Sequence, residues 1–392
     1  MNDRILHTPE GVRDLYGEEL ARKKHIERAL HKRLASFGYQ PIQTPTFEFF
    51  DVFGSKRGTS HAKSWYKFFD REGNTLVLRP DITPSIARAA AKYFTEEDRA
   101  IRLSYQGNIF DNNSSYQGHL KESTQLGAEL IGDPSVDADA EMIALVVCGM
   151  QAIGFLDFQI SVTHADLLSG LMEACRFDDD NREQIQSLIE NHNRFGLQEY
   201  LEEESVPADL AELFDSMTRI YNSPADWADL TNRCAAYPKI TEAFDRLEQI
   251  YEILKIYGVD SYVSFEPGLL ASSEYYTGLI FAGYTFGSGQ AFVRGGRYDQ
   301  LLSYFGKNAA AIGFAFSVDR LMLAASSQEL EIEEDGQDQL VFYHRSQRVK
   351  ALRLAHDLRQ AGQRVTLISC EDTRDLEAEK SRYAGARLTC LI

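Results

Sequence analysis

The 392-residue chain has little of what marks several broad classes of protein. It contains no run of about 18 apolar residues, so no transmembrane helix and no membrane association are predicted. Its first residues, MNDRILHTPEG, lack the apolar core of a signal peptide. Its five cysteines are odd in number and form no CxxC pair, which favours buried free thiols and a cytoplasmic location. The nine histidines show no metal-ligand spacing, so no metal site is predicted.

Positive charge is also scarce. Lys and Arg number 41 against 59 Asp and Glu, which gives a formal net charge of −18. This balance opposes non-specific attraction to nucleic acid, which depends on clustered basic residues. Hydrophobic residues make up 44% of the chain, enough for a sizeable core, and the length suggests more than one domain. The chain is therefore predicted to be globular and not to bind tRNA.

The most informative stretch is Leu269 to Phe281, LLASSEYYTGLIF. It is followed by RGGRYD, which begins at Arg294, and by AAIGFAFSVDRL, which ends at Leu321. A strand, a glycine turn, a second strand and a helix carrying Arg320 would build one wall of a small-molecule pocket, because glycine lets backbone approach a ligand closely. Alternatively, the glycine pair marks an ordinary hairpin, and Arg320 caps its helix or pairs with Asp319 or Asp299.

Two further segments carry polar residues suited to ligand binding. Asp81 and Thr83 follow a predicted hairpin (65–70 and 75–78) and precede a predicted helix over 84–94, where they would either contact a ligand or cap the helix. Gln125 and Glu129 lie in a segment over 102–132 and share one face of a strand. A carboxylate near the phenol of Tyr276 can satisfy both nitrogens of an imidazole. The alternative is a strand with a polar solvent face.

In their order and spacing these blocks resemble the histidyl-tRNA synthetase family of class II synthetases, from Thr8 to about Ala325. The resemblance implies an α+β fold with a class II aminoacyl-tRNA synthetase-like core, an antiparallel sheet flanked by helices, over residues 1–325. A helical insertion is expected at about 178–242. A linker over 326–339 and a small α/β C-terminal domain over 340–392, similar to a shortened anticodon-binding domain, complete the expected organisation.

The resemblance also implies roles for individual residues. The matching family positions assign the α-ammonium of histidine to Asp81, Thr83 and Gln125, and the imidazole to Glu129 and Tyr276. The expected histidine-binding residues are Asp81, Thr83, Gln125, Glu129, Tyr275 and Tyr276. The extended segment over 39–47 matches motif 1 and implies a self-dimer around a proline, here Pro45. On its own, Pro45 would also suit an ordinary edge strand.

The chain departs from the synthetase pattern at the catalytic positions. Asp111 and Ala271 stand where synthetases carry arginines, and Glu274 replaces an aspartate. A like-charge contact at 4 Å costs on the order of 4 kcal/mol at an effective dielectric of 20, so Asp111 would repel a phosphate that the arginine would attract. We therefore expect no catalytic residues and no cofactor.

An intact amino-acid pocket without catalytic arginines resembles the synthetase-like regulatory subunits of ATP phosphoribosyltransferase, which takes part in the first step of histidine biosynthesis. This resemblance implies a non-catalytic protein that pairs with a short-form catalytic subunit in a hetero-octamer and responds to L-histidine as feedback effector. Two alternatives stay open: a histidyl-tRNA synthetase with altered catalytic residues, and a paralogue that activates another amino-acid derivative with ATP.

Overall fold

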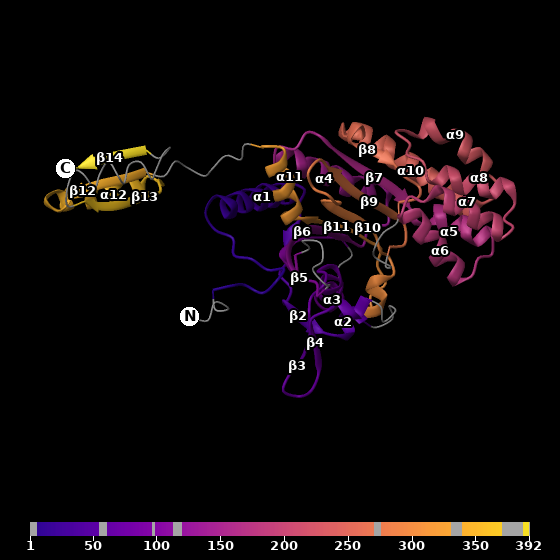
Figure 1. Cartoon of the computed structure of the whole chain (residues 1–392), viewed down its shortest axis with the longest axis horizontal. Helices are drawn as coiled ribbons and strands as arrows, with labels where there is room; N and C mark the ends of the chain where they lie inside the picture. Colours follow the sequence, from indigo (N-terminus) through magenta and orange to yellow (C-terminus); the bar gives the residue numbers. More distant parts are fainter. Residues whose placement is uncertain are drawn as a thin grey trace. The chain divides into compact units, whose positions relative to one another are not determined.

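The computed structural model describes residues 6–54, 61–95, 99–112, 120–269, 276–330, 339–370 and 387–391. The chain divides into two compact units, Met1–Leu330 and Glu331–Ile392. Figure 1 shows the elements of both units.

An eight-stranded sheet forms the centre of the first unit, in the order β1-β5-β6-β11-β10-β9-β7-β8. The strands from β5 to β7 in this order pair antiparallel, whereas β1 and β8 run parallel to their neighbours. This arrangement confirms the expected antiparallel core. The bounds are β1 Gln40–Pro41, β5 Ile101–Phe110, β6 Glu122–Ile131, β7 Phe158–His164, β8 Val263–Phe265, β9 Leu279–Thr285, β10 Val293–Arg297 and β11 Ala311–Ser317.

Four helices cover one face of this sheet: α1 (Gly17–Ser36), α4 (Val136–Ala152), α10 (Pro238–Tyr257) and α11 (Val318–Ser327). Helix α1 forms where the apolar spacing predicts it, and Ile26, Leu30 and Leu34 are buried on one side. Gly149 of α4 lies against Phe316 of the sheet, since a Cβ at this glycine would be 3.2 Å from the ring. This face is therefore the packed back of the sheet.

The opposite face carries α3 (Thr83–Tyr93) and the short helix η4 (Leu301–Phe305), which lie together over β5. Helix α3 begins one residue earlier than predicted, with Ile82 at the N-cap and no side-chain capping bond. The alternative that Asp81 and Thr83 cap this helix is therefore wrong. Their side chains have other partners, described below.

A smaller sheet in the order β2-β4-β3 extends from the core, next to α2 (Asp51–Gly54). Its strands are β2 Phe47–Phe49, β3 Lys67–Phe69 and β4 Thr75–Leu78. The hairpin of β3 and β4 was predicted, and Gly73 in its turn has the positive φ of 88° that favours glycine. Of the segment over 39–47, only the two residues of β1 and the first residue of β2 are strand.

Between β7 and β8 the chain forms a group of short helices, which Figure 1 shows gathered beside these strands. Their bounds are α5 Ala165–Ala174, α6 Asp179–Glu190, α7 Arg194–Glu203, α8 Ala208–Met217 and α9 Pro224–Arg233. Asp178, the first residue of an acidic run, caps α6 in a capping box with Asn181. The long helix predicted over 243–257 begins at Pro238, because a proline at the first helical position is favourable.

The second unit contains β12 (Gln339–His344), α12 (Arg348–Gln360), β13 (Val365–Cys370) and β14 (Arg387–Leu391). All three strands are parallel, in the order β13-β12-β14. The β-α-β fragment was predicted, whereas the third strand was not. Residues 387–391 are too few to show a clear strand periodicity. Their pairing partner, β12, lies more than 40 positions away in sequence.

Candidate functional site

The polar residues of β6 lie on the face of the sheet that α3 covers. Gln125, Gly127 and Glu129 alternate with Leu126 and Ala128, which are buried against the helices of the other face. Across the strand, β5 presents Gly107 opposite Gln125. The alternative of a solvent-facing polar strand is wrong, because the side chain of Glu129 is only 1% exposed.

Glu129 is held from two sides. The hydroxyl of Thr83 donates to its Oε1 at 2.8 Å, and the hydroxyl of Tyr298 donates to its Oε2 at 2.5 Å. The carboxyl group lies directly over Gly313 of β11, where an added Cβ would be 1.5 Å from Oε2. Only glycine at position 313 leaves room for the carboxyl group.

Tyr276 lies next to this carboxyl group. Its ring covers Gly296 of β10, where an added Cβ would be 2.7 Å from a ring atom. Gly296, Gly313 and Glu129 are aligned across the three adjoining strands β10, β11 and β6. Because neighbouring strands are about 4.8 Å apart, the ring of Tyr276 and the carboxyl group of Glu129 occupy adjacent positions on one surface. This is the pairing that an imidazole would require.

Gln125 presents an acceptor without a partner. Its Oε1 is buried and makes no hydrogen bond to any described residue. Such an atom is costly unless a donor reaches it, and an α-ammonium is a suitable donor. Asp81 lies at the end of the segment that leads into α3, and its Oδ1 accepts from the backbone N–H of Ile82 at 2.7 Å.

The expected site residues thus fall into three groups. Thr83, Glu129 and Tyr276 come together around the carboxyl group, with the Thr83 hydroxyl bonded to Glu129 rather than directed to a capping role. Gln125 lies two residues further along the same strand face, and Asp81 lies just before Thr83. Tyr275, like Ala271 and Glu274, lies outside the described residues.

Sequence reasoning missed Tyr298 and Tyr105 as partners of this site. Tyr298 belongs to the RGGRYD motif and is 2% exposed, and its bond to Glu129 connects the two strongest sequence blocks. The hydroxyl of Tyr105 lies over Gly127, 2.6 Å from where a Cβ would be. The alternation of β5 would have placed Tyr105 on the pocket face, since it lies two residues from Gly107.

The protonation of Glu129 depends on its surroundings. Burial raises the pKa of Glu129 to about 8, from an ordinary value of 4.5, although the hydroxyls of Tyr298 and Thr83 act in the opposite direction. A buried carboxyl group can therefore hold a proton near neutral pH. Together with an imidazole, it can share one proton between an oxygen and a ring nitrogen.

This raised pKa predicts how stability depends on pH. Between about pH 4.5 and about 8 the unfolded chain releases the Glu129 proton while the folded chain keeps it. As pH rises through this range, the free energy of unfolding of the wild type should therefore fall by up to about 1.4 kcal/mol per pH unit relative to Glu129→Gln. Urea unfolding of both proteins across this range measures the difference. If the free energies of unfolding of the two proteins changed with pH in the same way, the raised pKa of Glu129 would be contradicted.

Arg320, in the last of the three sequence blocks, forms hydrogen bonds within the protein. Arg320 donates to the backbone oxygen of Ala291 at 2.7 Å and to the side chain of Gln290. Asp319 instead accepts from the backbone N–H of Thr124 at 2.7 Å. The alternatives that pair Arg320 with Asp319 or Asp299 are therefore wrong.

Asp111, which directly follows β5, is exposed.

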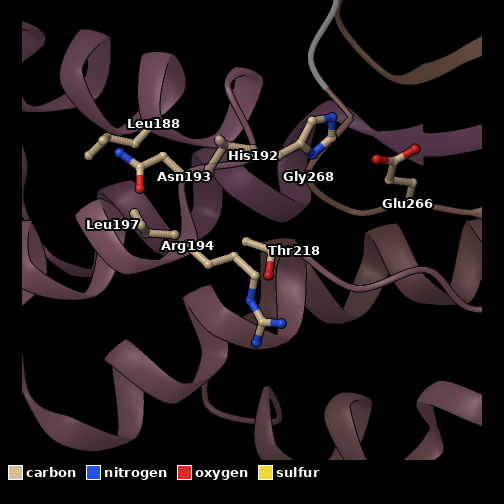
Figure 2. A pocket seen from close by; sticks show the side chains of 9 residues that line it. Leu188, His192, Asn193, Arg194, Leu197, Thr218, Glu266 and Gly268 are labelled. Carbon is tan, nitrogen blue, oxygen red and sulfur yellow. The ribbon is translucent and has the colours of Figure 1, made fainter.

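A separate small cavity of about 50 Å³ lies among the short helices (Figure 2). It is lined by Leu188, Ile189, His192, Asn193, Arg194, Leu197, Thr218, Glu266 and Gly268. Arg194 is already paired with Asp215. None of the residues expected to bind histidine contributes to this cavity, so it is distinct from the candidate site.

The described residues contain neither a metal-binding cluster nor a helix suited to span a bilayer. No cluster of three or more His, Cys, Asp and Glu side chains there has metal-binding geometry. None of the helices in the same ranges combines the length and the apolar character of a bilayer span. All five cysteines are free, but only Cys234 is buried and Cys390 is exposed, so the expectation of buried thiols holds for one of them.

Comparison with known proteins places this chain in a family. A family model described as histidyl-tRNA synthetase matches residues 11–321. A protein of Acetivibrio thermocellus named "ATP phosphoribosyltransferase regulatory subunit" is 36% identical, with 91% of this chain and 85% of that protein covered. A protein of Ruminiclostridium cellulolyticum with the same name is 34% identical, with 99% and 92% covered.

Solved structures agree. A Bacillus halodurans protein described as an "ATP phosphoribosyltransferase regulatory subunit/histidyl-tRNA synthetase" superposes with a TM-score of 0.87 at 28% identity, covering 99% of both chains. A histidyl-tRNA synthetase from a Nostoc species superposes with a TM-score of 0.82 at 18% identity, covering 97% of this chain and 90% of that one, which supports the fold alone. The chain therefore belongs to the ATP phosphoribosyltransferase regulatory subunit family, whose members share the fold of histidyl-tRNA synthetases.

Proposed function

We propose that this chain is the non-catalytic regulatory subunit of an ATP phosphoribosyltransferase and that it binds free L-histidine as feedback effector. The proposed binding residues are Asp81, Thr83, Gln125, Glu129, Tyr275 and Tyr276. The observation that carries the proposal is the buried carboxyl group of Glu129 beside the ring of Tyr276, with the unpartnered oxygen of Gln125 on the same strand face. The names of the relatives support the regulatory role.

The synthetase reaction is not expected of this chain. Asp111 is an exposed acidic residue at the position where the resemblance calls for a cation, and phosphoryl and acyl-phosphate chemistry depends on positioned positive charge. A histidine pocket without that cation suits a sensor. We propose that a short-form catalytic subunit carries the chemistry, in a cytoplasmic hetero-octamer.

An activity assay tests this role. The short-form catalytic subunit, alone and with this chain, would be supplied with ATP and phosphoribosyl pyrophosphate. We expect turnover to require this chain and to fall when L-histidine is added. Histidine-dependent exchange of pyrophosphate into ATP by this chain alone would favour the histidyl-tRNA synthetase alternative instead.

We also propose a self-dimer through the motif 1 region. Phe47 and Phe49 of β2 are 51% and 54% exposed and point away from the face of Glu48, which is 8% exposed. Phe68 of β3 extends this aromatic surface, with its ring centroid 5.7 Å from that of Phe47. Exposed aromatic clusters of this kind mark interaction surfaces.

The double variant Phe47→Ser, Phe49→Ser should therefore be monomeric where the wild type is dimeric, as measured by sedimentation velocity of the isolated chain. The control is Phe195→Ser in α7, which removes an even more exposed ring (77%) from a different element and should leave the mass unchanged. A wild-type monomer, or a double variant that stays dimeric, would contradict the assignment.

A further inference from the structure

Arg79 is a buried cation that forms no ion pair with any acidic side chain in the described part of the chain. Its side chain is 6% exposed, and within the described ranges its hydrogen bonds go to backbone oxygens and one hydroxyl. Nε donates to Asn108 at 2.7 Å, and Nη1 donates to Thr44 at 3.0 Å. The nearby acidic residue Glu48 interacts with Arg79 through its charge, but its Oε1 accepts a hydrogen bond from Arg88 at 2.7 Å. A buried charge left without a counter-ion is costly, so a function for this arginine is to be expected.

The third nitrogen of Arg79 lies on the candidate site. Nη2 covers Gly107 of β5, where an added Cβ would be 2.1 Å away, and it makes no hydrogen bond to any described residue. Gly107 is directly opposite Gln125, whose Oε1 is the unpartnered acceptor. An open cationic group and an open acceptor therefore occupy neighbouring positions across two strands.

We propose that Nη2 of Arg79 binds the α-carboxylate of the amino acid held at this site. This inference rests on the proposed histidine binding and adds the residue that recognises the acid group. The α-ammonium and α-carboxylate of an amino acid share one carbon atom, so their receptors must be adjacent. Gln125 and Asp81 serve the ammonium, and Asp81 follows Arg79 by two residues. The ligand carboxylate then supplies the counter-ion that Arg79 lacks.

Other cations near the sheet are less suited. Arg294 lies on the same face as Gly296, but β10 is two strands, about 9 to 10 Å, from β6. Arg294 is also in line with Gly127 rather than with Gln125. Arg320 is bonded to Ala291 and Gln290. Lys23 donates to Thr124, whose side chain lies on the opposite face of β6 from Gln125. Arg79 alone among these four adjoins Gln125.

The test compares two ligands that differ in the acid group. L-Histidinol has the imidazole and ammonium of L-histidine but no carboxylate. Titration calorimetry of the full wild-type chain should show histidine binding about 10- to 100-fold more tightly, the range for a charge-assisted hydrogen bond. In Arg79→Gln the preference should fall to about 1 while histidinol affinity is retained. Arg79→Lys keeps a cation and should retain part of the preference.

The matched control is Arg294→Gln, which removes the other pocket-face arginine and should keep the full preference. Equal affinity of the wild type for the two ligands would overturn this inference without requiring any variant to fold. Loss of the preference in Arg294→Gln, or its persistence in folded Arg79→Gln, would overturn it too. Binding of neither ligand by the wild type would instead contradict the histidine site itself.

Discussion

Replacing Glu129 with alanine should weaken L-histidine binding by about 10- to 100-fold, because a hydrogen bond to a charged group contributes about 1.5 to 3 kcal/mol and each 1.4 kcal/mol is tenfold in affinity. The variant loses the acceptor that we propose for the imidazole. Thr83 and Tyr298, which now donate to the carboxyl group, have hydroxyls that can turn to other partners or water. Calorimetric titration of both proteins measures the effect.

The matched control is Glu122→Ala. Glu122 lies on the same strand but on the other face, where its carboxylate accepts from Asn108 at 2.6 Å. This variant should bind histidine as the wild type does. Equal weakening in both variants would show that damage to β6, rather than loss of the Glu129 acceptor, causes the effect.

A second large effect is expected at Asp139, which joins three elements behind the site. Its side chain is fully buried on α4, and Arg297 of β10 donates to Oδ1 through Nε at 2.9 Å and through Nη2 at 2.6 Å. Arg246 of α10 donates to Oδ2 at 2.7 Å. Asp139→Ala leaves the two guanidinium groups without their shared partner and should destabilise the protein by about 3 to 5 kcal/mol.

Urea unfolding followed by circular dichroism measures this loss. Asp137→Ala is the control, because Asp137 belongs to the first turn of the same helix but is exposed, and it should change stability by less than about 1 kcal/mol. Since Arg297 precedes Tyr298, the Asp139 variant should also bind histidine more weakly where it remains folded. Wild-type stability in Asp139→Ala would contradict the role given to this ion triad.

Much of the site could be predicted from strand periodicity. The period of two along a strand predicted that Gln125 and Glu129 share one face. The start of the helix next to Asp81 and Thr83 was predicted to within one residue. The fold was predicted by resemblance, and its antiparallel centre is confirmed.

The hydrogen-bond partners could not be read in this way. The bond of Tyr298 to Glu129 joins residues 169 positions apart, and it depends on the alignment of β10, β11 and β6, which no local pattern encodes. The same holds for Arg79, which reaches Gly107 because a loop after β1 supplies carbonyl oxygens to its guanidinium group. The parallel strand β14 was missed because parallel pairing is between segments distant in sequence.

The proposed feedback by histidine also has a thermodynamic consequence. If histidine lowers the activity of the complex by favouring one of two states, its affinity must differ between these states. Thermodynamic linkage is reciprocal. If histidine changes the affinity of this chain for the catalytic subunit by some factor, the catalytic subunit changes the affinity for histidine by the same factor. Histidine affinity should therefore differ between the free chain and the active complex.

The most direct test of the account is calorimetric titration of the full chain with L-histidine, and separately with ATP together with L-histidinol. We expect saturable binding of histidine, weakened in Glu129→Ala, and no heat from ATP beyond that of histidinol. ATP binding, or histidine binding that is unchanged in Glu129→Ala, would contradict a histidine sensor built on this carboxyl group.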